Sequence, residues 1–358
     1  MNVSDRSDAL VVGATGISGQ AICRRLVAAG RRTYGLSRRT ELPVADAIPV
    51  TADLLDEGQL REALADIRPE AVFVTAWMRQ SDEAANIAVN SALLRNVLVA
   101  LEAGGSVEHV ALMTGLKHYL GSFEDYGNGV QAETPFHESE PRLPSPNFYY
   151  AQEDELFAAA QRMGFTWSVH RSHTVCGFAV GNAMNMVLTL SVYATICRET
   201  GRPFIFPGSE TQWNGLTDVT DATLLADQMI WAAASPHGHN QAFNTANGDV
   251  FRWRWLWPQL AALFDVTPVG FDTAPRPLED QMHDAASVWK DIAARHGLVE
   301  HDVDRLASWW HTDADLGRDI ECLTDTTKAR SAGFDGFRAT PQSLADTVAQ
   351  YRAARLIP

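Results

Sequence analysis

Long apolar runs, paired cysteines and an excess of basic residues are all missing from this 358-residue chain. No apolar run reaches the roughly eighteen residues that a transmembrane helix needs, so we expect no membrane partner. Residues 1–8 are polar and contain two acids instead of a basic and apolar leader, so a cytoplasmic protein is expected. The four cysteines stand far apart, without metal-ligand or redox-motif spacing. We therefore expect reduced, buried thiols and no metal site.

Lysine and arginine number only 29 against 44 aspartate and glutamate residues, which gives a formal net charge of −15. This balance argues against nucleic acid or an anionic membrane as the main partner, because both select for clustered positive charge. An anionic ligand would have to be held by local donors. The 46% hydrophobic content and the length allow a sizeable core and predict a second, smaller lobe.

Short β-rich runs alternate with longer amphipathic stretches in the first half of the chain, which indicates βαβ units and a parallel sheet. Strands are expected at Ala9–Val12, Arg32–Leu36, Ile48–Thr51, Ala71–Thr75, His109–Met113 and Thr166–His170. Helices are expected at Gly19–Ala29, Asp56–Ala65, Glu83–Ala103 and Asn147–Met163. Residues 120–146 are rich in glycine, proline and acids, and we expect a long loop there.

A glycine-rich turn follows the first predicted strand and opens the first predicted helix. Its sequence is Gly13-Ala14-Thr15-Gly16-Ile17-Ser18-Gly19. A strand before and a helix after are the context that a dinucleotide fingerprint requires. Gly13 is expected to make the tight turn, Gly16 to let the backbone approach the pyrophosphate, and Gly19 to permit close packing of helix on strand. The helix N-terminus would supply free N–H groups and a positive partial charge to the phosphates.

The sequence therefore predicts an α/β fold with a Rossmann-type, doubly wound parallel sheet in residues 1–180, completed by segments around 203–248. Beyond residue 171 the alternation fades, and helices are expected within 182–199, 218–234, 251–264 and 275–317. Residues 181–358 are accordingly predicted to form mainly a smaller, helical, substrate-binding lobe, as in extended short-chain dehydrogenases.

The end of the second predicted strand favours NADPH over NADH. Ser37, Arg38 and Arg39 stand where an NAD site usually has an acid, and guanidinium groups suit a 2′-phosphate. A solvated basic turn is the alternative interpretation. The other residues expected along the cofactor are Thr15, Ile17, Asp53, Leu54, Thr75, Ala76, Trp77, Thr114, Gly115 and Val175.

The usual catalytic pattern of short-chain dehydrogenases, Tyr and Lys four residues apart on one helix, is missing. Tyr150 is followed four residues later by Asp154, and an acid there would raise the pKa of the phenol. Lys117, just after the fifth predicted strand, is a candidate replacement cation at the carboxyl edge of the sheet. Gly115 occupies the position where a serine would be expected.

Three segments of the chain closely resemble the progesterone 5β-reductase and iridoid synthase-like (PRISE) enone reductases, an atypical branch of the short-chain dehydrogenases. They are Thr114–Tyr119, Asn147–Asp154 and Trp167–Arg171. The similarity runs from Gly13 to the C-terminus and includes Gly177-Phe178, Phe206–Gly208, Gln228–Ala232, Trp309-Trp310 and Gly333–Phe337. After Arg171, however, this chain has Ser172-His173 where the plant members usually have proline, and an imidazole there could alter substrate choice.

The resemblance implies NADPH-dependent reduction of the C=C bond of α,β-unsaturated carbonyl compounds. It also implies that Lys117 and Tyr150 are catalytic, with the adjacent Tyr149 as the alternative phenol. A small hydrophobic enone or enal would contact apolar walls, for which the candidates are Trp77, Phe148, Tyr149, Phe178 and Met184. A homodimer is possible. The alternatives left open are a carbonyl reductase or sugar epimerase of the extended class, and a non-catalytic NADP-sensing regulator.

Overall fold

The computed structural model describes residues 8–122 and 133–358, and its contacts divide the chain into two compact units. The first unit consists of residues up to 173 together with 222–245 and 325–336. The second consists of 174–221, 246–324 and 337–358. The sequence predicts a main boundary at residue 180 and segments around 203–248 that complete the sheet. Residues 222–245 lie within that range, whereas the return of residues 325–336 to the first unit is not predicted.

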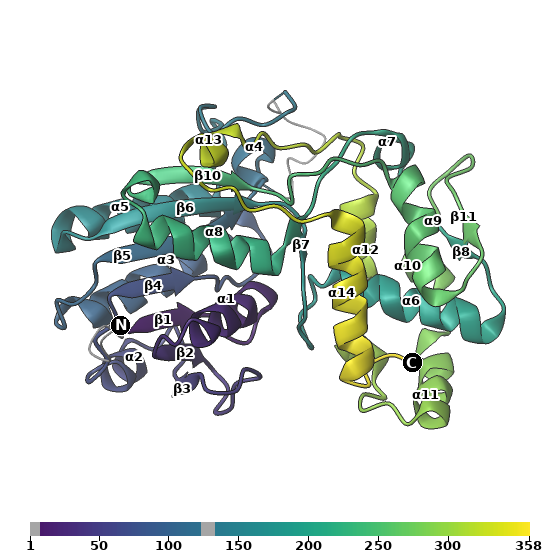
Figure 1. Ribbon diagram of the computed structural model, residues 1–358, viewed down its shortest axis with the longest axis horizontal. Coiled ribbons are helices and arrows are strands. Elements are labelled where there is room, and N and C mark those ends of the chain that lie inside the picture. The colour runs from purple at the N-terminus through teal and green to yellow at the C-terminus, as the bar shows by residue number, and fades with distance from the viewer. Residues whose placement is uncertain (1–7, 123–132) are drawn as a thin grey trace. The chain divides into compact units, whose positions relative to one another are not determined.

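The described part of the first unit is built on a seven-stranded sheet in the order β10-β6-β5-β4-β1-β2-β3, and every pairing in it is parallel (Figure 1). The strands are β1 Ala9–Val12, β2 Thr33–Ser37, β3 Ile48–Thr51, β4 Ala71–Val74, β5 His109–Gly115, β6 Thr166–Ser172 and β10 Gln241–Thr245. The chain reverses direction of travel across the sheet between β1 and β4, which makes the sheet doubly wound and confirms the predicted α/β class.

Helices cover both faces of this sheet, as a parallel sheet requires. The helical elements of the unit are α1 Ile17–Ala28, α2 Glu57–Ala63, α3 Glu83–Glu102, α4 Lys117–Leu120, α5 Phe148–Met163, α8 Ala222–Ala234, η1 Pro236–Gly238 and α13 Thr327–Ser331. α1 packs against α8, whereas α3 packs against α2 and α5. The apolar side chains of β1, β4 and β5 are almost completely buried between these two layers.

The strands and helices predicted for the first half all exist, with ends that shift by one or two residues. The predicted loop 120–146 lies partly outside the described residues, and α4 occupies its beginning. α3 is long and apolar enough by composition to cross a membrane, but half of its most apolar stretch is buried inside the protein. Since it packs along α5 within this unit, we regard α3 as a core helix.

The second unit is mainly helical and has only short two-stranded pairings among its described residues. Its helical elements are α6 Met186–Thr200, α7 Glu210–Asn214, α9 Trp253–Phe264, α10 Leu278–Gln281, α11 Ala285–His296, η2 Val303–Arg305, α12 Trp309–Leu316 and α14 Thr340–Ala353. The strands are β7 Val175–Cys176, β8 Phe204–Ile205, β9 Thr220–Asp221 and β11 Pro268–Val269; β7 pairs with β9 and β8 with β11.

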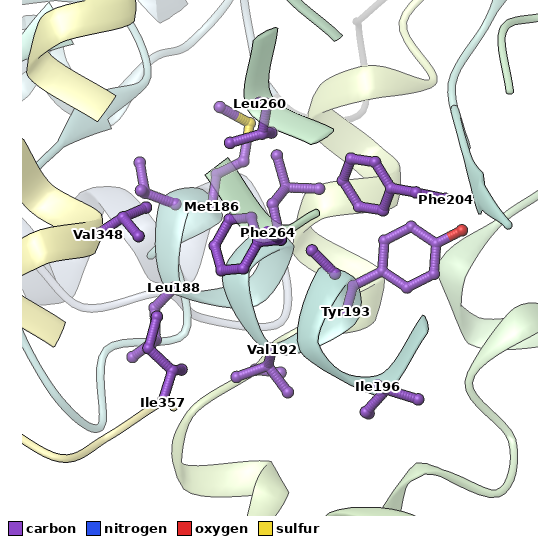
Figure 2. Packing of buried hydrophobic residues seen from close by; sticks show 14 of the residues in the cluster. Met186, Leu188, Val192, Tyr193, Ile196, Phe204, Leu260, Phe264, Val348 and Ile357 are labelled. Atoms are coloured by element: carbon purple, nitrogen blue, oxygen red, sulfur yellow. The ribbon is translucent and has the colours of Figure 1, made fainter. Parts of the chain in front are cut away.

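α6 is the centre of the second unit and is buried along its first twelve residues. Figure 2 shows Val192 and Tyr193 of this helix among apolar side chains that include Phe204 of β8 and Phe264 of α9. The rings of Phe204 and Trp257 stack with centroids 4.0 Å apart. Burial of this size supplies the second unit with a hydrophobic core of its own. All four cysteines are buried and free, as predicted.

Candidate active site

The glycine turn between β1 and α1 leaves no room for side chains at two of its positions. Gly13 has φ +89°, and a Cβ there would lie 2.9 Å from the backbone nitrogen of Ala76. A Cβ on Gly19 would lie 2.1 Å from the carbonyl oxygen of Gly13, so the helix can approach the strand only because this residue is glycine. Gly16 is the N-cap of α1, and no side chain of the described residues caps this end. The first N–H groups of α1 are therefore not used by a capping side chain, and such groups can bind an anion.

The other residues predicted along the cofactor lie at the carboxyl ends of neighbouring strands. Ser37 is the last residue of β2, and its hydroxyl accepts a hydrogen bond from the backbone N–H of Arg39 at 3.1 Å. Arg38 and Arg39 are exposed beyond it. Asp53, after β3, accepts from the N–H of Leu55 at 2.9 Å, so one carboxylate oxygen serves a local turn. The strands are parallel, so these residues share one edge of the sheet with the glycine turn.

Thr75 directly follows β4 and Thr114 lies near the end of β5, so both are at the same edge of the sheet. The Thr75 hydroxyl donates to the carbonyl oxygen of Val12 at 3.0 Å, which ties the end of β4 to the end of β1. Thr114 is buried, and its hydroxyl has no hydrogen-bond partner among the described residues. Ala76 and Trp77 continue beyond β4 and are partly exposed, and Leu54 packs on the core of the unit.

Lys117 begins α4, directly beyond β5, and its ammonium group is buried. Its Nζ atom lies 2.9 Å from Oε2 of Glu83, and the Lys117 side chain is only 3% exposed. The other oxygen of Glu83 accepts a hydrogen bond from the backbone N–H of Phe148 at 2.7 Å. One carboxylate at the start of α3 thus joins the ammonium group to the first residue of α5. Sequence reasoning missed Glu83, because 34 residues separate it from Lys117.

Asn147 makes a second link between Lys117 and α5. Its side-chain oxygen caps the helix by accepting from the N–H of Tyr149 at 3.0 Å. Its amide nitrogen donates to the carbonyl oxygen of Lys117 at 2.6 Å. The Phe148 ring, fully buried, lies under the Lys117 ammonium group at 4.4 Å from Nζ and stacks on Trp77 at 5.4 Å. Phe148 therefore packs between the Lys117 ammonium group and Trp77. Its contact with a substrate stays a prediction.

The two adjacent tyrosines of α5 have different surroundings, because neighbouring helix positions point about 100° apart. The Tyr150 hydroxyl donates to the carbonyl oxygen of His118 at 2.5 Å and accepts from the N–H of Leu143 at 2.9 Å. The Arg142 guanidinium lies over its ring at 5.0 Å. Burial raises the pKa of Tyr150. This phenol is fixed between two backbone groups.

The hydroxyl of Tyr149, in contrast, lies at the end of β5. A Cβ placed on Gly115 would be 3.2 Å from Tyr149 Oη, so the absence of a side chain at residue 115 leaves the space that the phenol occupies. Within the described residues this hydroxyl makes no hydrogen bond, unlike the backbone N–H of Tyr149, and the residue is partly exposed. Burial and the negative charge of Glu83 both raise the pKa of Tyr149. The two phenols thus differ in their surroundings, and the choice of Tyr150 as the catalytic phenol stays a prediction.

The model of a family described as the PRISE-like Rossmann-fold domain matches residues 41–358, which is most of the chain. The chain belongs to the PRISE-like family. An (S)-8-oxocitronellyl enol synthase of Camptotheca acuminata is 36% identical over 99% of this chain and 94% of its own length. A 3-oxo-Δ(4,5)-steroid 5β-reductase of Arabidopsis thaliana is also 36% identical, over 99% of this chain and 94% of its own length.

Solved structures show the wider fold class of this PRISE-like protein. A UDP-glucose 4-epimerase of Thermotoga maritima aligns with a TM-score of 0.68 at 18% identity, covering 97% of this chain and 99% of its own. An epimerase of Methanothermobacter thermautotrophicus aligns with a TM-score of 0.70 at 17% identity, covering 98% of this chain and 93% of its own. At such identities the likeness shows the fold alone, and the predicted Rossmann-type architecture is thereby confirmed.

A second group of polar residues missed by sequence reasoning gathers around Glu153 of α5 in the PRISE-like Rossmann unit. Glu153 is buried, with Arg142 at 2.9 Å and the Arg171 guanidinium at 3.7 Å. Nδ1 of His118 lies 3.8 Å from the same carboxylate, and neither ring nitrogen makes a hydrogen bond within the described residues. Burial lowers the pKa of His118 to about 3, so its imidazole is neutral at physiological pH.

Three predicted site residues belong to the second unit. Val175 is the first residue of β7, Phe178 packs on Tyr351 with ring centroids 5.4 Å apart, and Met184 is half-buried just before α6. Their proposed contacts with cofactor or substrate stay predictions. His173, the residue that departs from the plant pattern, is buried at the end of the first unit.

Proposed function

We propose that this protein is an NADPH-dependent reductase of the C=C bond of α,β-unsaturated carbonyl compounds. The observation that carries the proposal is the full-length similarity to relatives whose names describe related chemistry. A 3-oxo-Δ(4,5)-steroid is a conjugated enone. An enol is the first product when hydride adds to the β-carbon of a conjugated carbonyl compound. Both names therefore fit conjugate reduction.

A nicotinamide dinucleotide is the cofactor that the sheet edge would hold. The absence of side chains at Gly13 and Gly19 allows a tight turn, in which the backbone can approach a pyrophosphate closely. The uncapped N-terminus of α1 offers N–H donors and a positive partial charge. The epimerase structures that share the fold include one solved with NAD. When bound, the reduced nicotinamide supplies the hydride. Ser37, Arg38 and Arg39 at the end of β2 support a 2′-phosphate and hence NADPH.

Tyr149 is proposed to stabilise the negative charge that builds on the substrate carbonyl oxygen. Its hydroxyl lies beside Gly115 at the carboxyl edge of the sheet and makes no hydrogen bond within the described residues. Because burial and Glu83 raise its pKa, the phenol keeps its proton at neutral pH and can donate it in a hydrogen bond. Protonation of the α-carbon can come from solvent and needs no protein acid.

Lys117 is proposed to contribute positive charge beside this phenol. The contacts of Lys117 with Glu83 and with the Phe148 ring hold the ammonium group inside the protein, where electrostatic interactions are stronger than in water. Its position on α4 replaces the helix-borne lysine of ordinary short-chain dehydrogenases. The substrate that such a site suits is small and apolar, with one carbonyl oxygen to be held.

The test is NADPH oxidation by the purified protein against a panel of enones, enals and saturated ketones, with the products analysed by mass and by NMR. Saturation of the C=C bond with the carbonyl retained supports the proposal. An allylic alcohol or a reduced saturated ketone as the product would instead support a carbonyl reductase. Tight NADPH binding without turnover on any substrate would support the non-catalytic regulator.

A further inference from the structure

Glu83 lies beside both groups to which the proposed chemistry assigns a role, Lys117 and Tyr149. It is the first residue of α3, and Asp82 caps that helix through the N–H of Ala85. The Glu83 side chain is about one-tenth exposed, and the amide of Asn86 donates to it at 3.3 Å. A buried carboxylate is costly unless donors and positive charge surround it. The site supplies both.

We propose that Glu83 is a positioning residue, a buried carboxylate that holds the Lys117 ammonium group against the start of α5 and keeps both Lys117 and Tyr149 protonated. This inference rests on the proposed function, because it assigns Glu83 to the same phenol and ammonium pair. Nothing in the family match or in the names of the relatives assigns a role to this residue.

The positioning part of the inference follows from the two oxygens of Glu83. Oε2 contacts the Lys117 ammonium group at 2.9 Å, and Oε1 accepts from the Phe148 N–H at 2.7 Å. Asn147 ties the backbone of Lys117 to the same helix end at 2.6 Å. The ammonium group is therefore fixed relative to α5 through its side chain as well as through its backbone. Tyr149 is the next residue of α5 after Phe148, so its phenol shares this fixed frame.

The charge part follows from the sign of the groups that meet here. Glu83 approaches from α3, Lys117 from α4 and Tyr149 from α5. A negative charge favours the protonated form of an amine and of a phenol alike. Glu153 of α5 and Arg171 of β6 belong to the group around His118, and Glu83 is the charged residue that acts on the Tyr149 phenol. Glu83 is thus placed to delay proton loss from both proposed catalytic groups as the pH rises.

The experiment compares Glu83→Gln with Glu83→Asp in steady-state kinetics from neutral to alkaline pH. Gln keeps the size and removes the charge, whereas Asp keeps the charge and shortens the side chain by one methylene. We expect Glu83→Gln to lower kcat more than it raises the KM for the enone. The alkaline limb of its pH profile of kcat should move to lower pH by about one unit or more. Glu83→Asp should lower kcat and leave the limb close to that of the wild type.

Glu153→Gln is the matched control, because Glu153 is another buried carboxylate with a cation partner and lies on α5 itself. It should lower the melting temperature and leave the alkaline limb in place. If Glu83→Gln destabilises the fold but the limb of the folded fraction does not move, Glu83 is merely structural and the inference is overturned. If Glu83→Gln does not fold, Glu83→Asp decides the positioning role. An unchanged kcat in that variant contradicts it.

A titration of tyrosine absorbance in the ultraviolet tests the same idea without any substrate. The difference between Glu83→Gln and Glu83→Gln/Tyr149→Phe isolates the ionisation of Tyr149 from that of the other tyrosines. The midpoint of this ionisation should lie at a lower pH than the midpoint obtained from the difference between the wild type and Tyr149→Phe. An unchanged midpoint refutes the charge role of Glu83. Because no enone is needed, this result stays informative even if the wild type reduces none, which would count against the proposed function alone.

Discussion

The two tyrosines of α5 provide the sharpest test of the site, because their hydroxyls have different surroundings. Tyr149→Phe removes a hydroxyl that lies at the end of β5 and makes no hydrogen bond within the described residues. Its loss should cost little stability. If this hydroxyl donates to the developing enolate, its removal should cost about 3–4 kcal/mol of barrier, or two to three orders of magnitude in kcat.

Tyr150→Phe should show the reverse pattern. Its hydroxyl joins the carbonyl oxygen of His118 to the N–H of Leu143, and both groups would be left without this partner in a buried environment. We expect a loss of about 1–3 kcal/mol in the free energy of unfolding, which for a unit of this size lowers the melting temperature by several degrees. Turnover by the folded enzyme should fall by less than about tenfold, since this hydroxyl is not placed to reach a substrate.

Stopped-flow oxidation of NADPH with a saturating enone measures the hydride step directly, and thermal unfolding measures stability in parallel. The KM for NADPH should stay near the wild-type value in both variants, because neither hydroxyl contacts the glycine turn. The reasoning is refuted if Tyr149→Phe turns over normally while Tyr150→Phe, folded and binding NADPH, loses two orders of magnitude. In that case the sequence-based order, with Tyr150 first, would be right.

Three further changes test the cofactor edge and the fold. Arg38→Ala/Arg39→Ala should raise the KM for NADPH about tenfold or more and leave the KM for NADH nearly unchanged. An equal rise in both KM values would show that these arginines do not bind the 2′-phosphate. Gly19→Ala should abolish NADPH binding measured by fluorescence titration, because its Cβ would lie 2.1 Å from a backbone oxygen, and retained binding would contradict that crowding. Stability should also depend on acid, because burial lowers the pKa of three imidazoles, to about 3 for His109 and His118 and to about 4 for His170. Since these folded-state values lie below the unfolded one, their contribution is complete above about pH 6.5 and declines as the pH falls toward 3, by up to about 1.4 kcal/mol per pH unit for each imidazole. Urea denaturation across this range measures the slope, and a flat profile would show that these histidines are not buried as neutral groups.

The Rossmann part of the fold could be predicted from the sequence because its signals are local. The glycine turn, the apolar strands and the amphipathic helices each occupy a short stretch, and the order of the strands follows from right-handed crossovers. The edge strand β10 and the helix α8 were harder to assign, because they follow the helical segment 186–200 in the chain and join the sheet only through long-range contacts.

The candidate site was predictable only in part. Lys117 and the tyrosine pair could be found because they lie on motif segments. The choice between Tyr149 and Tyr150 could not be made from the sequence, since it depends on which way two adjacent side chains point. Glu83 carried no signal at all, because an acid just after Asp82 at a predicted helix start is typical of capping. Its pairing with Lys117 becomes visible only when α3, α4 and α5 meet.

The edge position of β10 has a consequence for how the protein is made on the ribosome. β6 ends at residue 172, and the strand that pairs with its free side is not complete until residue 245. At bacterial or eukaryotic elongation rates of about 5–20 residues per second, the nascent sheet exposes the edge of β6 for roughly 4–15 seconds. An unpaired strand edge is a template for wrong pairing. The nascent chain between these two points is therefore where a chaperone would have most to protect.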